Sequence, residues 1–255
     1  RNSAEVEFFS REAIPPAEPD PESIRRAVEL LVKAQKPLIW AGGGAILSDG
    51  SAELSDLAAA LGAPVVTTPE GKGAISEDHL LSLGGGYYGF GAIRWAMPQA
   101  DVVLAVGTRF TWQQQRPGTA LKPPQKLIHL DADPSVIGKN YPAEVAIVAD
   151  AQAGLRALVE AVRKEKVAKE RWLTSELDQF RQNHLNWLQE KAPLQYDIIK
   201  TLRKELADDA ILVAGVTNIG YWANLAYTVR RPRTFITSSY FATLGYSFPT
   251  ALGVK

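Results

Sequence analysis

Short apolar runs without internal alternation recur through the first two thirds of the chain. Each run is too short for a typical helix and lacks the apolar–polar alternation of a half-solvated strand. Each is therefore predicted to form a parallel strand that is buried on both faces. The predicted strands are Pro37–Ala41, Pro64–Thr68, Val102–Gly107, Lys126–Leu130 and Val145–Val148.

Between these runs, apolar residues return every three or four positions, which is the spacing of one helix face. The first helix is predicted to begin near Asp20, a capping residue, with Pro21 in its first turn. The other predicted segments are helices over Ser51–Leu61 (closed by Gly62), Phe90–Met97 and Gln152–Glu165, a helical turn after Pro134 and a long loop over Pro69–Gly86. Strands that alternate with helices predict right-handed crossovers, and so an α/β fold with a doubly wound parallel sheet.

The pattern changes after residue 165. Residues 164–191 are highly charged with interspersed apolar positions, which predicts a helical connector packed on a neighbour. A second α/β unit follows, with predicted helices over Tyr196–Leu206, over Asn218–Tyr227 and from Phe248 or Pro249, and strands over Ala210–Gly215 and Thr234–Ser238. Two strands are too few for a complete sheet.

These observations predict four regions: a linker over residues 1–19, a central domain over 20–165, a connector over 166–192 and the start of another domain over 193–255. The first region is rich in proline, and the last predicted helix is interrupted at Lys255. A domain should close its core before it stops, so we expect the chain to be a fragment of a longer protein.

Charge and composition exclude several function classes. Lys plus Arg and Asp plus Glu both number 28, so no strong field favours nucleic acid or an anionic membrane. The chain has no cysteine, which rules out disulfides, thiolate metal sites and a cysteine nucleophile. No apolar run approaches the roughly 18 residues of a membrane span. We expect a cytoplasmic protein without nucleic-acid or membrane partners.

Several predicted strands end in Gly or Asp, which places a candidate site at the carboxyl edge of the sheet. The clearest case is Gly42-Gly43-Gly44, where backbone N–H groups would face a ligand at a helix start. The triplet is not the dinucleotide fingerprint, because Leu47 stands at the sixth position. A tight strand–helix turn explains the glycines equally well.

The tail from Ser239 to Lys255 reads Ser-Tyr-Phe-Ala-Thr-Leu-Gly-Tyr-Ser-Phe-Pro-Thr-Ala-Leu-Gly-Val-Lys. It resembles the start of the diphosphate-binding domain of the thiamine-diphosphate enzymes, the group of acetolactate synthase, benzoylformate decarboxylase and pyruvate oxidase. The first part of the chain is similar to their central domain, through the glycine triplet, the run 105–110 and the run His129–Asn140. The resemblance covers residues 20–255.

The resemblance implies a bent thiamine diphosphate whose two rings are wedged together by one large apolar side chain. Leu244 stands at the matching position, and the alternative for it is an ordinary core leucine. Ala242 and Leu244 match residues whose backbone groups bond the aminopyrimidine edge, and Thr243 lies between them.

The resemblance also implies that the diphosphate is gripped at the helix start Ile219-Gly220-Tyr221-Trp222. Tyr221 and Trp222 stand where acetolactate synthases commonly carry Gln and His, which weakens the acetolactate assignment but not the cofactor. The alternative for Trp222 is a core position or a substrate-pocket wall.

In relatives the central domain binds FAD, ADP or a CoA-type nucleotide, or binds no nucleotide. The candidate contacts here are Gly42, Gly43, Gly44, Gly84, Gly85, Gly86, Gly107, Thr108, Arg109, Asp131, Asp133 and Asp150. Arg109 suits a bidentate phosphate contact, and the acids suit a ribose or an adenine edge. Helix capping by Asp133 and a salt bridge of Arg109 are the alternatives.

Two parts of the implied machinery lie outside these residues. The glutamate that activates the cofactor is expected upstream, on an N-terminal pyrimidine-binding domain of a second subunit, and the Mg²⁺ ligands are expected after Lys255. No catalytic residue and no metal ligand are therefore assigned within the segment, which should be inactive alone. The intact protein is expected to be a homodimer or homotetramer.

The expected activity is that of a lyase or transferase acting on a 2-oxo acid by decarboxylation, carboligation or both, as in acetolactate synthase. The alternatives are a benzoylformate- or pyruvate-type decarboxylase or oxidase and, in another class, a non-catalytic nucleotide-binding module. His79, His129 and His184 lie far apart in the sequence and are interpreted as structural.

Overall fold

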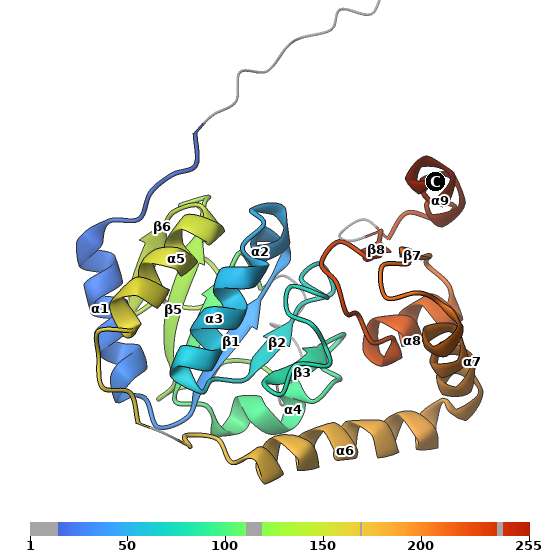
Figure 1. The fold of residues 1–255 in the computed structure, drawn as a ribbon, viewed down its shortest axis with the longest axis horizontal. Coiled ribbons are helices and arrows are strands. Elements are labelled where there is room, and N and C mark those ends of the chain that lie inside the picture. The colour runs from blue at the N-terminus through green and yellow to red at the C-terminus, as the bar shows by residue number, and fades with distance from the viewer. Residues whose placement is uncertain (1–14, 111–118, 169, 239–241) are drawn as a thin grey trace, which may run out of the picture.

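The computed structural model describes residues 15–110, 119–168, 170–238 and 242–255. A six-stranded parallel sheet in the order β3-β2-β1-β4-β5-β6 forms the centre of the first part (Figure 1). Its strands are β1 (Pro37–Ala41), β2 (Val65–Thr67), β3 (Ser82–Gly85), β4 (Val102–Val106), β5 (Lys126–Asp131) and β6 (Val145–Val148). The α/β class with a parallel, doubly wound sheet is confirmed.

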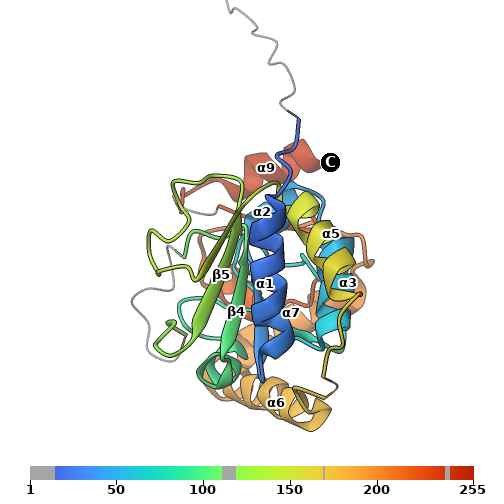
Figure 2. The same ribbon diagram turned by 90° about the vertical axis from the view of Figure 1, so that its left-hand side faces the viewer.

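Helices cover both faces of this sheet. One face carries α1 (Pro21–Lys33), α3 (Ser51–Leu61) and α5 (Ala151–Val162), which Figure 2 shows side by side. The other face carries α4 (Ile93–Ala96), a 3₁₀ turn (Met97–Gln99) and α6 (Thr174–Lys191).

Alternate residues of the central strands supply the two cores. On β1, Ile39 belongs to the core under α1, α3 and α5, whereas Leu38 and Trp40 belong to the core on the opposite face. All five residues of β1 and of β4 are buried, which is why these runs lack polar positions.

The helix starts follow the capping signals in the sequence. The Asp20 carboxylate accepts a hydrogen bond from the Ser23 N–H at the start of α1. Asp150 caps α5 by accepting from the N–H groups of Gln152 and Ala153. Gly62 ends α3 with φ +59°, a conformation that favours glycine.

A second, smaller unit follows α6. It consists of α7 (Pro193–Glu205), β7 (Leu212–Ala214), α8 (Asn218–Ala226), β8 (Phe235–Thr237) and α9 (Ser247–Val254). Strands β7 and β8 pair in parallel, and a small core of Ile199, Ala223 and Tyr227 packs beside them. In the part of the chain that the structure describes, this unit has only the two expected strands.

Some segments differ from the sequence prediction. The predicted loop Pro69–Gly86 contains β3, which pairs with β2 in an irregular register. Half of the residues of β3 are glycine, so the sequence of this strand does not indicate a strand. The helix start expected at the glycine triplet opens the short helix α2 (Gly43–Leu47), whose extent was not predicted. The helix predicted over Phe90–Met97 begins only at Ile93, whereas the turn predicted after Pro134 is present as hydrogen-bonded turns.

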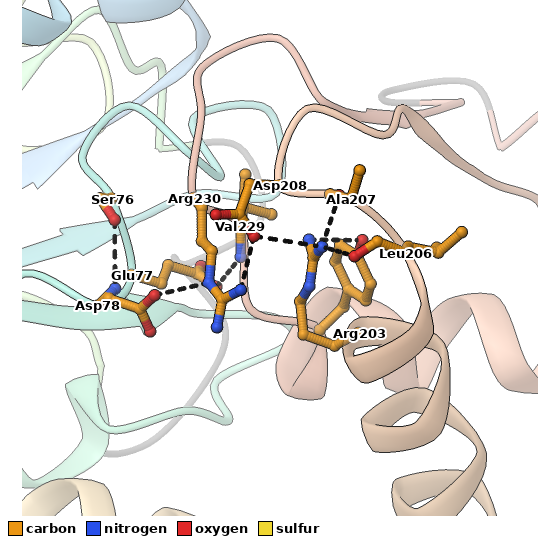
Figure 3. A network of polar contacts seen from close by, with 10 residues as sticks. Ser76, Glu77, Asp78, Arg203, Leu206, Ala207, Asp208, Val229 and Arg230 are labelled. Carbon is orange, nitrogen blue, oxygen red and sulfur yellow. Dashed lines mark hydrogen bonds and ion pairs between the residues drawn. The ribbon is translucent and has the colours of Figure 1, made fainter.

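A polar network holds the second unit against the first (Figure 3). The Arg230 guanidinium lies 2.7 Å from the Asp78 carboxylate, on the central-domain loop before β3, and 2.6 Å from Asp208 of the second unit. In the same region the Glu77 carboxylate accepts from the Val229 N–H and pairs with the buried ammonium of Lys72 at 2.7 Å.

Candidate functional site

A cavity of about 770 Å³ lies at the carboxyl ends of β1, β4, β5 and β6. This is the edge where an open parallel sheet binds ligands, and chain order reverses between β1 and β4. Predicted nucleotide contacts in the wall are Gly43, Gly44, Gly107, Arg109, Asp131, Asp133 and Asp150. The second unit supplies Arg233, Phe235, Ile236 and Thr237, so both units form the wall.

The glycines at the switch point serve close backbone packing. The N–H groups of Gly42 and Gly44 donate to the carbonyls of Val106 and Gly107, so the expectation that they face a ligand is wrong. A Cβ on Gly42 would lie 2.3 Å from the Gly107 oxygen, and one on Gly44 would lie 2.6 Å from the Gly107 Cα. Gly107 itself has φ +58°. Only residues without a side chain allow this approach.

The acids in the cavity wall also order the backbone around them. Asp131 accepts from the Asp133 N–H at 3.0 Å, and Asp133 accepts from the Ser135 N–H at 2.9 Å. The hydrogen bonds from Ser135 lower the pKa of Asp133, which keeps it a carboxylate at neutral pH. Asp131 and Asp133 are therefore hydrogen-bond acceptors held in fixed positions by the backbone.

Other predicted nucleotide contacts lie outside the described wall of this cavity. They are Gly42, Gly84, Gly85, Gly86 and Thr108. Gly85 packs toward the second unit, because a Cβ there would lie 2.9 Å from the Asn224 carbonyl oxygen. Thr108 is buried, and its carbonyl accepts from the His129 Nε2–H at 2.9 Å.

The amino end of α8 offers a short set of backbone donors. The Thr217 hydroxyl accepts from the Gly220 N–H, and the Thr217 carbonyl accepts from the Tyr221 N–H. The N–H groups of Asn218 and Ile219 have no acceptor within the helix, and so they are available to a ligand. A Cβ on Gly220 would lie 2.0 Å from the Gly215 oxygen, so the loop before the helix packs directly on its first turn.

Tyr221 and Trp222 point to different surroundings. The Trp222 ring lies 5.6 Å from the ring of Trp187 on α6, which places Trp222 in the wall between helices. The Tyr221 ring stacks on Tyr87 at 6.0 Å and remains 41% exposed.

The segment before α9 is close to α8. A Cβ on Gly215 would lie 2.6 Å from the Ser247 hydroxyl, so the end of β7 meets the first turn of α9. Ala242 lines a small pocket together with Gly215 and Tyr221. Leu244 is 78% exposed, and so it is not a core leucine among the described residues.

Two family models match the chain. The model described as "Thiamine pyrophosphate enzyme, central domain" matches residues 24–158, and "Thiamine pyrophosphate enzyme, C-terminal TPP binding domain" matches residues 215–255. The chain belongs to the thiamine pyrophosphate enzyme family. The cavity thus lies between the central domain of this family and the start of its cofactor-binding domain, and α8 and α9 lie within the cofactor-binding domain.

Curated relatives of this thiamine pyrophosphate family member include acetolactate synthases. The large subunit from Corynebacterium glutamicum is 34% identical over 94% of this chain, and the chain covers 40% of that protein. A probable acetolactate synthase large subunit from Methanocaldococcus jannaschii is 35% identical over 92% of this chain, and the chain covers 41% of that protein. The chain therefore spans about two fifths of the length of these relatives.

Sequence reasoning missed two features of this family member's site. Asn218, at the first position of α8, lies directly before the predicted set, which begins at Ile219. The signal was present, because Thr217 is a preferred N-cap residue directly before it. The contact of Tyr87 with Tyr221 was also missed: the sequence placed Tyr87 and Tyr88 only in a nucleotide-contacting loop, Gly84–Tyr88, and nothing local indicates that Tyr87 meets Tyr221.

The histidines of this family member form hydrogen bonds with backbone groups. His129 donates from Nε2 to the Thr108 carbonyl and accepts at Nδ1 from the Gly138 N–H, and His79 accepts from the Leu81 N–H. His184 donates to the Leu225 carbonyl. Among the residues that the structure describes, His, Asp and Glu form no cluster able to hold a metal ion. Within the same residues, no helix has the length and apolarity to cross a bilayer.

Proposed function

We propose that the chain is part of an enzyme that acts on a 2-oxo acid as acetolactate synthase does, by decarboxylation followed by carboligation. The observation that carries this proposal is the similarity to acetolactate synthase large subunits along 92–94% of the chain. The family models for the central and cofactor-binding domains support the same assignment.

The residues at α8 and before α9 fit thiamine diphosphate. The amides of Asn218 and Ile219 and the packed Gly215–Gly220 turn make a cradle for an anion, at the positive end of a nine-residue helix. The exposed Leu244 side chain would support the bent cofactor, and the backbone groups of Ala242 and Leu244, on either side of Thr243, would bond its aminopyrimidine edge. When bound, thiamine diphosphate supplies the carbanion that attacks the substrate carbonyl.

The remaining parts of the machinery belong to polypeptide beyond this segment. We assign the activating glutamate to an upstream pyrimidine-binding domain of a second subunit, and the ligands of Mg²⁺ to residues after Lys255. The intact enzyme is then a homodimer or homotetramer of the cytoplasm. Light scattering on the full-length protein tests the assembly, and a monomer with full activity would refute it.

The clamp role of Leu244 is tested by cofactor titration of the full-length protein. Leu244→Ala should weaken thiamine diphosphate binding about tenfold, equivalent to about 1.4 kcal/mol, and lower kcat. The matched control is Leu194→Ala, which truncates another leucine that is 68% exposed, on α7. Equal binding by both variants would contradict the clamp.

Product analysis separates the alternatives. A carboligase converts pyruvate to acetolactate, a benzoylformate- or pyruvate-type decarboxylase releases an aldehyde, and an oxidase consumes an electron acceptor. The non-catalytic alternative predicts nucleotide binding without turnover of any 2-oxo acid. We expect acetolactate as the main product.

The large cavity favours a second ligand, a nucleotide such as ADP or FAD. Its volume of about 770 Å³ suits a molecule of this size, and its wall combines Arg109 with the acids Asp131 and Asp150. Fixed carboxylates suit ribose hydroxyls, whereas the guanidinium suits a phosphate.

Flavin absorbance of the purified full-length protein and calorimetric titration with ADP test this second assignment. Asp131→Asn should weaken nucleotide binding, because the amide offers one acceptor oxygen instead of two. Asp197→Asn, on the exposed side of α7, is the control. Absence of binding by the unmodified protein would exclude the nucleotide.

A further inference from the structure

A buried ion pair on the central-domain loop before β3 meets the turn that joins α8 to β8. The Lys72 ammonium lies 2.7 Å from one Glu77 carboxylate oxygen, and the two side chains are only 1% and 7% exposed. The other carboxylate oxygen of Glu77 accepts from the Val229 N–H at 2.9 Å, and the Glu77 N–H donates to the Val229 carbonyl at 2.8 Å. Glu77 therefore holds the Val229 backbone at two points (Figure 3).

The same loop also packs on the Val229 side chain, which is fully buried. A Cβ on Gly73 would lie 2.6 Å from the Val229 Cγ1 atom. Gly73 has φ +88°, a conformation that favours glycine, and the missing side chain allows this approach. The central domain thus fixes the turn through both its backbone and its side chain.

Lys72 reaches the elements on either side of that turn. Its ammonium lies 5.6 Å from the ring centre of Phe235, the first residue of β8. A Cβ on Gly85 would lie 3.5 Å from the same ammonium and 2.9 Å from the Asn224 carbonyl oxygen on α8. The ion pair is therefore packed against α8, the turn and β8 together.

Both elements that leave this turn carry residues of the candidate cofactor site. Helix α8 begins with the N–H groups of Asn218 and Ile219, and β8 ends at Thr237, which lines the small pocket together with Ala242. A short helix and a short strand move as rigid elements, so a shift of their shared turn also shifts their far ends. Such a shift changes the spacing between the anion cradle and the segment that would hold the pyrimidine.

The charge of Lys72 keeps the Glu77 carboxylate in the position that Val229 requires. An ionised carboxylate bonds Lys72 with one oxygen and the Val229 N–H with the other, and both bonds are strengthened by charge. Without the carboxylate, the buried Val229 N–H would lose its acceptor and the buried ammonium would lose its counter-charge. Both costs oppose movement of the turn away from Glu77.

We propose that Glu77, oriented by Lys72, is a positioning residue for thiamine diphosphate: through Val229 it sets the place of α8 relative to β8, and with it the affinity for the cofactor. This inference rests on the proposed function, because it requires the diphosphate at the start of α8. Among the described residues that line the two pockets, Glu77 is absent. Its loss should therefore weaken cofactor binding and leave kcat at saturating cofactor nearly unchanged.

The test compares two double variants of the full-length protein, Lys72→Met with Glu77→Gln and Lys72→Met with Glu77→Leu. Both variants lack the two charges, but only Gln keeps an oxygen that can accept from the Val229 N–H. Calorimetric titration with thiamine diphosphate, at saturating Mg²⁺, should give a Kd about tenfold higher for the leucine variant than for the glutamine variant. Hydrogen exchange of the cofactor-free proteins should be faster over residues 227–234 in the leucine variant.

A further variant keeps the proposal testable if the leucine variant does not fold. Glu77→Asp retains the charge for Lys72 and draws the acceptor back by one methylene. It should also raise the Kd for thiamine diphosphate above that of the unmodified protein, with kcat at saturating cofactor nearly unchanged.

The control for a general loss of stability is Leu158→Ala, which removes a fully buried side chain from α5 and leaves the contacts of Glu77 intact. Its Kd for thiamine diphosphate should equal that of the unmodified protein. Equal Kd values for the glutamine and leucine variants, or an equal rise in Leu158→Ala, would overturn the positioning role while the proposed function stands. No binding of thiamine diphosphate by the unmodified full-length protein would overturn the proposed function, and the positioning role with it.

Discussion

At the scale of single residues, the most constrained position is the meeting of Gly42 and Gly44 with Gly107. The two loops that leave β1 and β4 approach so closely that a methyl group at any of the three would overlap backbone atoms of the opposite loop. Gly43, Gly44 and Gly107 also line the large cavity. The glycine triplet is therefore mainly a packing device, although Gly43 and Gly44 also line the cavity.

Gly42→Ala should destabilise the protein by about 1–3 kcal/mol or more, because the new Cβ overlaps the backbone oxygen of Gly107. Chemical denaturation measures the loss. The comparison variant is Gly62→Ala, where φ is +59° but no atom lies within 4 Å of a Cβ, so that only about 1 kcal/mol of backbone strain is expected. A smaller loss for Gly42→Ala than for Gly62→Ala would contradict the close approach.

His129 predicts a pH dependence at the residue scale. Burial lowers its pKa in the folded protein, although the bond to Thr108 and the charge of Asp131 act in the opposite direction. The unfolded chain, with a pKa near 6.5, therefore takes up the proton first. The stabilisation is complete above about pH 6.5 and is lost as the pH falls below it.

Urea denaturation at pH 7.5 and 5.5 tests this expectation. The free energy of unfolding should fall on acidification, and His129→Gln should reduce that fall because Gln does not titrate. The variant is compared with the unmodified protein at both pH values, so any loss of stability that does not depend on pH cancels. An equal fall in the free energy of unfolding between pH 7.5 and pH 5.5 in the two proteins would show that His129 makes no contribution to the pH dependence.

At the scale of elements, helices and strands form where the spacing of apolar residues predicts them, provided that the spacing continues over several turns or residues. The stripe of α3 places Leu54, Leu57 and Leu61 in the core, as the helical spacing requires. The connector is a helix over Thr174–Lys191 that packs on the sheet through Leu177 and Phe180. Short elements such as α2 and β3 depend instead on their partners.

Leu57→Ala on α3 should cost about 2–5 kcal/mol, because its side chain is fully buried and its removal leaves a cavity. Leu47→Ala removes the same atoms at the end of α2, where the leucine is 77% exposed, and should cost less than about 0.5 kcal/mol. Thermal and urea denaturation of the pair measure the difference. Similar losses would contradict the burial assigned to α3.

At the scale of the whole molecule, the contact between the two units builds both pockets. The large cavity needs Arg233 and β8, and the small pocket needs Tyr221 and Ala242 from the second unit beside Glu70 and Tyr87 of the first. Arg233 pairs with Asp49 at 2.7 Å, and Arg230 joins Asp78 to Asp208. Ligand sites at a boundary between units depend on how firmly the units are held together.

Arg230→Met should loosen this contact, because it removes the charge that joins Asp78 to Asp208 (Figure 3) and keeps most of the side-chain bulk. Limited proteolysis should cleave the segment after α8 faster in the variant. Added salt should reduce the difference in cleavage rate between the variant and the unmodified protein, because salt screens exposed ion pairs. Arg25→Met, which breaks an exposed pair within α1, should leave the cleavage rate unchanged.

The candidate site was only partly predictable. Asp131, Asp133 and Asp150 follow buried strands, so their place at the carboxyl edge follows from parallel topology alone. Gly84, Gly85 and Gly86 share the glycine-rich character of the other candidates but lie outside that cavity wall, because β3 is an edge strand facing the second unit. The local sequence indicates a ligand site equally for the candidates inside the cavity wall and for those outside it. Only the order of the strands in the sheet separates the two groups.

The sequence by itself determined the alternation of strands and helices, the capped helix starts, the acidic strand ends and the resemblance to thiamine-diphosphate enzymes. These features depend on neighbours within a few residues, and local periodicity and turn chemistry record them. Only the tertiary structure decided that Gly42 packs on Gly107, that Trp222 meets Trp187 and that Tyr87 stacks on Tyr221. Those contacts join residues far apart in the chain, and they arise from the packing of whole elements, which no local pattern encodes.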